Sequence, residues 1–106
     1  MLKFHKQRST YMASATARHI LVRNKKLAQK IKEELIEGDI IFEKAAKKYS
    51  KCPTGKRKGF LGSFFKGDMV KEFDEVVFTK KTPLNKVVGP VKTEFGYHLI
   101  EVLARN

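Results

Sequence analysis

The chain has 106 residues, one cysteine and a formal net charge of +12, which together allow a single domain with a modest core and exclude an internal disulfide. No apolar run approaches the ~20 residues of a membrane span, and no apolar segment follows the basic N-terminus as in a secretory signal. We therefore expect a soluble, cytoplasmic, monomeric protein that makes no contact with membranes.

The first 16 residues are polar and basic and lack hydrophobic periodicity, which predicts a flexible N-terminal arm. Met12 offers a second start, so residues 1–11 could be an upstream extension of the chain. Nine lysines and arginines precede Glu33, the first acidic residue. This charge favours acidic partners, among them a weak contact of the arm with nucleic acid or ribosomes. The alternative is a solvated lysine-rich surface.

Residues 17–106 are predicted to form one domain with the element order β-α-α-β-α-β-β. Short β-rich apolar runs indicate the strands, and apolar residues three and four positions apart indicate the helices. Gly89-Pro90 interrupts one strand or places it at a sheet edge. An α+β domain with helices packed on a mostly antiparallel sheet accommodates this order. In chain order we expect strand 17–23, helix 25–38 ending at Gly38, helix 42–49 capped by Asp39, loop 51–59, strand 60–64, helix 70–78, strand 87–91 and strand 97–104.

The most informative stretch, residues 52–73, joins a lone thiol at Cys52 to a basic glycine-rich loop and three spaced large apolar residues. Two histidines, His19 and His98, stand at apolar runs elsewhere in the chain. A polar trio beside an apolar pocket suits a reaction that needs desolvation more than a strong nucleophile. This combination points towards prolyl cis/trans isomerisation. The three apolar residues are Leu61, Met69 and Phe73.

Several ordered motifs of the chain resemble those of one known family. They are Arg18-His19-Ile20-Leu21-Val22, Phe42 followed by Ala45-Ala46-Lys47-Lys48-Tyr49-Ser50, Cys52-Pro53-Thr54-Gly55-Lys56-Arg57, Gly59-Phe60-Leu61-Gly62, Lys66-Gly67-Asp68-Met69-Val70 with Phe73, Gly89-Pro90-Val91 and Thr93-Glu94-Phe95-Gly96-Tyr97-His98. Over residues 17–106 their order and spacing are similar to the parvulin-type peptidyl-prolyl isomerases, above all the small single-domain bacterial parvulins. The resemblance implies an FKBP-like fold with a four-stranded mostly antiparallel sheet and about four short helices.

The resemblance also implies site residues. The catalytic set would be His19, Cys52, Thr93 and His98, with the two histidines facing each other at the floor of the sheet and linked through Thr93. Leu61, Met69 and Phe73 would form the proline pocket, and Phe95 would close its rim. Lys56, Arg57 and Lys58, on the loop after the cysteine, could attract acidic residues beside the target proline; the alternative is a solvated loop. For each apolar residue taken singly, ordinary core packing is the alternative.

The implied reaction is non-covalent rotation about Xaa-Pro bonds in polypeptide clients, which assists protein folding and uses no metal or cofactor. Two residues depart from the family pattern: Phe60 stands where Asp is usual, and Lys58 where Gly is common. The phosphate-reading branch of the family carries an Arg-rich insertion after its first strand. Here Arg23 leads through Asn24 straight into the expected helix. Obligatory recognition of phosphorylated residues is therefore not expected.

Three other classes of protein remain open at this point. A nucleic-acid or ribosome binder is favoured by the charge, although the sequence has no helix-turn-helix or zinc ligand pattern. A thiol enzyme or metal protein is disfavoured, because the cysteine and the histidines lack close ligand spacing. A holdase would use the same apolar pocket to bind unfolded segments without turnover.

Overall fold

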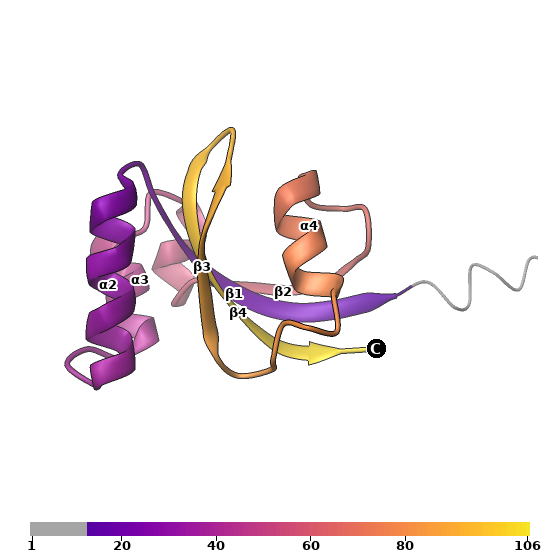
Figure 1. The fold of residues 1–106 in the computed structure, drawn as a ribbon, viewed down its shortest axis with the longest axis horizontal. Coiled ribbons are helices and arrows are strands. Elements are labelled where there is room, and N and C mark those ends of the chain that lie inside the picture. Colours follow the sequence, from indigo (N-terminus) through magenta and orange to yellow (C-terminus); the bar gives the residue numbers. More distant parts are fainter. Residues whose placement is uncertain (1–12) are drawn as a thin grey trace, which may run out of the picture.

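The computed structural model describes residues 13–106. Four strands form one sheet in the order β2-β1-β4-β3, and every neighbouring pair is antiparallel. The predicted α+β class is confirmed, and so is the element order (Figure 1). The elements are β1 (Ser14–Val22), α2 (Lys25–Glu37), α3 (Phe42–Tyr49), the 3₁₀ helix η1 (Pro53–Arg57), β2 (Phe60–Phe65), α4 (Lys71–Phe78), β3 (Val87–Thr93) and β4 (Gly96–Arg105).

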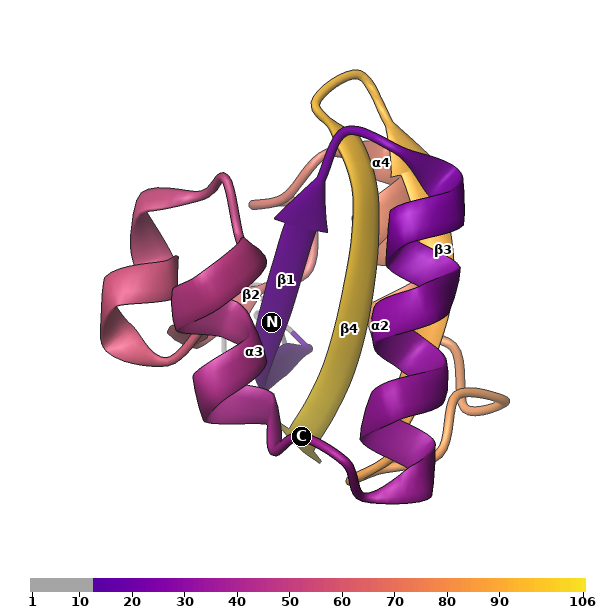
Figure 2. The same ribbon diagram turned by 90° about the vertical axis from the view of Figure 1, so that its left-hand side faces the viewer.

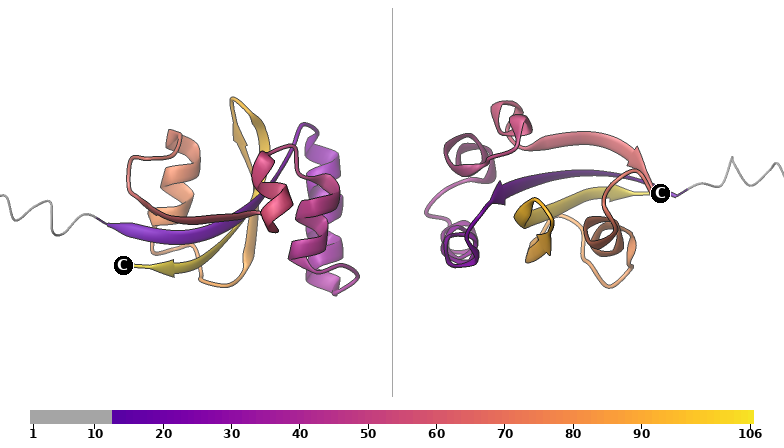
Figure 3. Two further views of the ribbon diagram at one scale, coloured as in Figure 1. Left: turned by 180° about the vertical axis from the view of Figure 1, so that it is seen from behind. Right: turned by 90° about the horizontal axis from the view of Figure 1, so that it is seen from above.

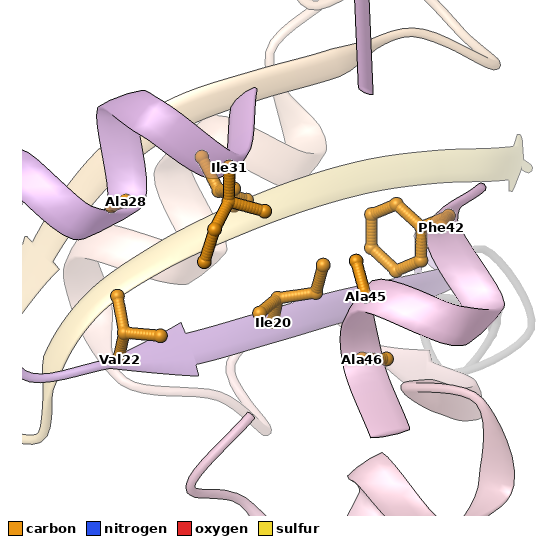
Figure 4. Packing of buried hydrophobic residues seen from close by; sticks show 8 residues of the cluster. Ile20, Val22, Ala28, Ile31, Phe42, Ala45 and Ala46 are labelled. Carbon is orange, nitrogen blue, oxygen red and sulfur yellow. The ribbon is translucent and has the colours of Figure 1, made fainter. Parts of the chain in front are cut away.

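One face of the sheet is covered by α2 and α3. In Figure 2 both helices lie in front of β1 and β4. Apolar residues recur at helical spacing in both helices, so each presents one apolar stripe to the strands. Figure 4 shows this packing at close range. The fully or nearly buried cluster consists of Ile20, Val22, Ala28, Ile31, Phe42, Ala45, Ala46 and Leu99.

The opposite face of the sheet carries α4 and a second core. Neighbours along a strand point to opposite faces, so Leu99 belongs to the first core and Ile100 to the second. Arg105 ties α4 to the sheet: its guanidinium donates to the carbonyl oxygens of Val77 and Thr82, each at 2.8 Å. Figure 3 shows α4 apart from α2 and α3. The second core contains Ala15, Ala17, Phe64, Phe73, Val77, Ile100 and Val102.

The structure corrects three local predictions. β1 begins at Ser14, so residues 14–16 belong to the sheet and not to the arm; residues 1–12 lie outside the described part of the chain. Asp39 does not cap α3, because two residues separate it from the first turn and Ile41 holds the N-cap position without a side-chain hydrogen bond. The loop 51–59 contains η1, which begins at Pro53.

β2 and β3 are the two edges of the sheet. At β3 the register shifts between Val88 and Val91, and Lys32 of α2 donates to the Gly89 carbonyl oxygen at 2.7 Å. The predicted edge position of this strand is confirmed. At β2, Asp68 engages both backbone groups of Phe65: its carboxylate accepts from the Phe65 N–H at 2.9 Å, and its N–H donates to the Phe65 carbonyl at 3.0 Å.

The helices are all short, and α2 is the longest with 13 residues. Asn24 begins it by accepting from the Leu27 N–H, and Gly38 ends it in the left-handed conformation at φ 83°. Gly38 was the predicted stop signal, and the structure confirms it. Within residues 13–106, no helix has both the length and the apolar character needed to cross a membrane.

Candidate active site

Hydrogen bonds from the Ser50 side chain and the Lys51 backbone fasten the segment after α3 to β1. Ser50 Oγ accepts from the N–H groups of Leu21 and Cys52, at 3.1 and 3.3 Å. The Lys51 N–H donates to the Leu21 carbonyl at 2.7 Å. These bonds hold the half-buried Cys52 beside the strand that carries His19. Cys52 and His19 are far apart in the sequence, and these hydrogen bonds bring the segment of Cys52 next to the strand of His19.

His19 and His98 lie on the neighbouring strands β1 and β4 and are both buried. Their Nδ1 atoms are 3.0 Å apart, and the rings stack at an interplanar angle of 19°. The histidines therefore face each other directly, as expected. Thr93 does not lie between them: its Oγ1 contacts Nε2 of His98 at 2.7 Å, on the far side of that ring. The link through Thr93 was wrong, because the two strands bring the rings into direct contact.

A continuous chain of hydrogen bonds runs from the β3–β4 turn to the thiol. The Phe95 N–H donates to Thr93 Oγ1 at 3.1 Å. At the other end, Thr54 Oγ1 donates to Cys52 Sγ at 3.1 Å and lies 3.4 Å from Nε2 of His19. With the Thr54 hydroxyl hydrogen directed at the sulfur, Thr54 accepts from His19, because a hydroxyl carries one hydrogen, and the proton of that ring is assigned to Nε2. This assignment of hydrogens fixes every other bond in the chain.

The remaining directions follow one by one. With its proton on Nε2, neutral His19 accepts at Nδ1, so the Nδ1–H of His98 must donate to it. His98 then accepts at Nε2 from the Thr93 hydroxyl. Every hydrogen bond points the same way, towards Cys52 Sγ, and no hydroxyl hydrogen is left without an acceptor.

This arrangement requires both rings to be neutral, and burial provides that. Two effects lower the pKa of His19 from 6.5 to about 4: first the removal of the ring from water, and second the charge of the neighbouring His98. Burial also lowers the pKa of His98. Two protonated rings would each present an N–H at the Nδ1 contact, so the pair cannot take up two protons and keep this hydrogen bond. At neutral pH both histidines are uncharged.

Beside the histidine pair lies a cavity of about 590 Å³ with a mostly apolar lining. Its lining includes all four residues of the predicted proline pocket: Leu61, Met69, Phe73 and Phe95. The Phe73 ring meets both imidazoles edge-on, with centroid distances of 5.6 and 5.4 Å to His19 and His98. Phe95 is 56% exposed and stands at the mouth. We call this cavity the proline pocket.

Of the three basic residues predicted to contact acidic substrates, only Lys56 lines a cavity. Lys56 lines a second hollow of about 350 Å³, which we call the lysine hollow, together with Lys47 and Lys51. Arg57 and Lys58 line neither cavity. Within the proline pocket the cationic lining residues are Arg23 and Lys51, and Asp68 is the acidic one. The structure thus brings together the polar and apolar sets of the prediction but only one of the three basic residues.

The PPIC-type PPIase domain, also called rotamase, matches residues 5–104 of the chain. The chain belongs to the PPIC-type PPIase family. It is similar to the foldase protein PrsA 1 of Bacillus cereus, with 44% identity over 96 residues, which are 90% of this chain and 32% of that protein. The chain thus spans about a third of the length of the curated relatives it matches.

Solved structures of PPIC-type PPIases agree with this membership. The peptidylprolyl isomerase PrsA of Bacillus anthracis superposes with a TM-score of 0.84 at 31% identity, covering 93% of this chain and 45% of that one. NmPin, the parvulin of Nitrosopumilus maritimus, superposes with a TM-score of 0.75 at 39% identity, covering 86% of this chain and 96% of NmPin. The parvulin resemblance of the sequence is therefore confirmed.

Sequence reasoning missed three residues of this PPIC-type site. Thr54 connects Cys52 to His19, and its signal was a hydroxyl residue directly after Pro53 in a tight turn. Arg23 and Lys51 line the proline pocket, although neither was singled out. Arg23 lies directly after the end of β1 and lines the same pocket as His19 and Leu21, so continuing the period-two count from His19 past the strand end could have found it.

Proposed function

We propose that this chain is a peptidyl-prolyl cis/trans isomerase that rotates Xaa-Pro bonds in polypeptide clients and so assists their folding. The single observation that carries the proposal is the apolar proline pocket, whose Phe73 wall is shared with the buried pair of neutral histidines. The pocket offers an apolar surface on one side and an ordered polar network on the other. The reaction proposed is non-covalent and independent of phosphate.

The chemistry needs a surface that prefers a twisted amide. Rotation about an Xaa-Pro bond meets a barrier of ~18–20 kcal/mol, because amide resonance is lost on the way. In the perpendicular state the carbonyl is less polar, so apolar and water-poor surroundings favour that state over the planar one. A ~1000-fold acceleration requires only about 4 kcal/mol of such preference. Binding alone can supply this, without a covalent step or a cofactor.

The pocket residues have separate roles in this proposal. Phe73 gives the pyrrolidine ring a flat wall, and its burial against both histidines keeps that wall in place. Met69 and Leu61, both half-buried, complete an adaptable apolar lining. The exposed Phe95 covers the bound ring from the solvent side. Together these contacts remove water from the proline as the bond turns.

The polar network would position and polarise the thiol. Because all its hydrogen bonds point towards Cys52, the sulfur sits at the acceptor end of a dipole chain that begins at the Phe95 N–H. The polar partner of the sulfur is the Thr54 hydroxyl and not an imidazole base. Support for covalent attack would require a base in contact with the thiol. We therefore assign to Cys52 an electrostatic effect on the substrate carbonyl, and to the histidines a positioning role.

The proposal is tested with two-dimensional exchange NMR on peptides Ala-Xaa-Pro-Phe, in which Xaa is Leu, Met, Lys, Glu or phosphoserine. We expect faster cis/trans exchange for the unmodified peptides. Exchange enhanced for phosphoserine alone would contradict phosphate independence. A folded sample that accelerates none of the peptides would contradict the isomerase function itself.

Replacing Cys52 by alanine should lower kcat/KM but not abolish it. The Thr54 hydroxyl loses its acceptor, and one hydrogen bond of about 1 kcal/mol corresponds to roughly fivefold in rate. The exchange assay on the Leu-Pro peptide measures the change. Cys52→Ser restores an acceptor and should retain more activity than Cys52→Ala. Complete loss of activity in a folded Cys52→Ala protein would argue for a covalent role.

We also propose the partners and the location that the sequence predicted. Polypeptide clients are supported by the likeness to foldase proteins. A cytoplasmic location, a monomeric state and a weak contact of the N-terminal arm with nucleic acid or ribosomes stay predictions. Gel filtration, cell fractionation and binding of DNA or RNA before and after removal of residues 1–12 would test them in turn.

A further inference from the structure

The segment that runs from α3 through η1 is strongly basic. Residues 44–58 contain seven lysines and arginines and no acidic residue. The two ion pairs within residues 13–106 are both made by Arg18, so none of the seven side chains is neutralised in this way. Because the cations come from α3, its connector and η1, their placement depends on how closely those segments pack.

That packing brings three of the lysines around the lysine hollow. Lys47 comes from α3, Lys51 from the connector and Lys56 from η1. Gly55 makes the approach possible, since a Cβ at this position would lie 2.8 Å from the Ala46 carbonyl oxygen. Only glycine therefore lets η1 rest directly on the end of α3. The three ammonium groups are presented by backbone that hydrogen bonds hold against β1.

The lysine hollow adjoins the proline pocket. Lys51, Cys52 and Pro53 line both cavities, so the two spaces share one rim. An extended client chain advances about 3.3 Å per residue, so residues a few positions from a bound proline can cross this rim. Residues directly beside the proline remain in the proline pocket. The lysine hollow is therefore reached by more distant residues of the same client.

We propose that the lysine hollow is a binding site for client carboxylates, which gives the isomerase a preference for prolines with Asp or Glu about two to five residues away. The inference rests on the proposed function and names its substrate class. Three unpaired ammonium groups attract carboxylates more strongly than one. Arg57 and Lys58 contribute less, because they line neither cavity. Lys58 also lies within charge range of Glu43. The pKa of Glu43 is lowered first by a backbone hydrogen bond, then by Arg18 and least by Lys58.

The test compares proline peptides that differ only in the position of an acidic pair. A neutral peptide with Leu-Pro at its centre is the reference, and Glu-Glu is moved from two to five residues away on either side. For the unmodified protein we expect roughly fivefold higher kcat/KM at the best position, since exposed ion pairs contribute modestly. The gain should shrink in 0.5 M NaCl, because salt screens exposed charges.

Two double variants of equal charge separate the lysine hollow from the net charge. Lys47→Gln with Lys56→Gln removes two of its cations and should abolish most of the gain. Lys30→Gln with Lys80→Gln removes two exposed cations that line neither cavity and should keep the gain. The readout is the ratio of acidic to neutral peptide within each protein. Folding of each variant is checked by its amide NMR spectrum.

Several outcomes would overturn the inference. Turnover of the neutral peptide with no acidic preference at any position would leave the isomerase function standing and remove the carboxylate site. An equal loss in both double variants would assign the preference to overall charge. A Lys47/Lys56 variant that loses binding to a duplex DNA 20-mer but keeps its peptide ratio would assign the lysine hollow to nucleic acid. No turnover of any peptide would overturn both proposals.

Discussion

Met69→Ala should lower kcat/KM for Xaa-Pro peptides by about thirtyfold while the domain stays folded. The substitution removes roughly three methylene-sized groups from the wall of the proline pocket, at ~0.8 kcal/mol each. A loss of about 2 kcal/mol in binding the twisted amide corresponds to about thirtyfold in rate. Met69 is only half-buried, so the free energy of unfolding should change little. Exchange NMR gives the rate, and urea denaturation gives the stability.

Leu84→Ala is the matched control for the Met69 substitution. Leu84 is a large apolar residue, 43% exposed, that does not line the proline pocket. This variant should retain full isomerase activity. If Met69→Ala reduces activity less than about threefold, the pocket does not recognise the twisted proline. If both substitutions reduce it equally, general loosening of the fold and not pocket contact explains the effect.

Lowering the pH from 7 to 4 should remove about 3 kcal/mol from the free energy of unfolding through the histidine pair. In the folded state the pKa of His19 is about 4, because the ring is buried, whereas in the unfolded chain it is near 6.5. The unfolded state therefore binds the proton first as the pH falls. The loss begins near pH 6.5 and levels off near pH 4. Urea denaturation at half-unit pH steps measures it.

His5→Ala provides the control for this titration. It removes the third histidine of the chain, so every remaining imidazole signal comes from His19 or His98. In this variant the His19 imidazole shifts should stay nearly constant from pH 7.5 to about 5, since burial lowers the pKa of that ring to about 4, and the His98 shifts should titrate below the ordinary histidine range, since burial lowers its pKa too. Imidazole signals that titrate near pH 6.5, together with flat stability over the same range, would show that the pair is accessible to water in the folded state.

Much of the fold could be predicted because its signals are local. Apolar spacing in residues 25–37 and the glycine that follows determine α2 almost to the residue. The start of β1 was predicted three residues too late, at 17 and not at 14, because Ser14 and Thr16 are polar. Polar residues on the open face of a strand give no hydrophobic signal. The start of α3 at residue 42 was predicted correctly, but Asp39 was misplaced as its cap, because a capping residue must directly precede the first turn and Ile41 holds that position.

In the candidate site, too, some residues could be predicted from the sequence and others could not. The residue types and their order identified the histidines, the thiol and the apolar pocket, and family membership is confirmed. Thr54 could not be placed, because its contact with His19 depends on the path of η1 and not on spacing in the chain. The position of Thr93 failed for a related reason: which side of an imidazole a hydroxyl reaches is decided by strand register.

The bonds between Asp68 and Phe65 bear on how the proposed polypeptide clients would meet the sheet. An extended chain can pair with the free backbone groups of a sheet edge as an additional strand. The exposed Phe60 and Phe65 would strengthen such pairing at β2 by adding apolar contacts. Asp68 occupies both backbone groups of Phe65, so the ladder that a newcomer would have to build is interrupted. Under the proposed function, a client would be held by side chains in the proline pocket and not by backbone pairing with β2, so its release would break only those side-chain contacts.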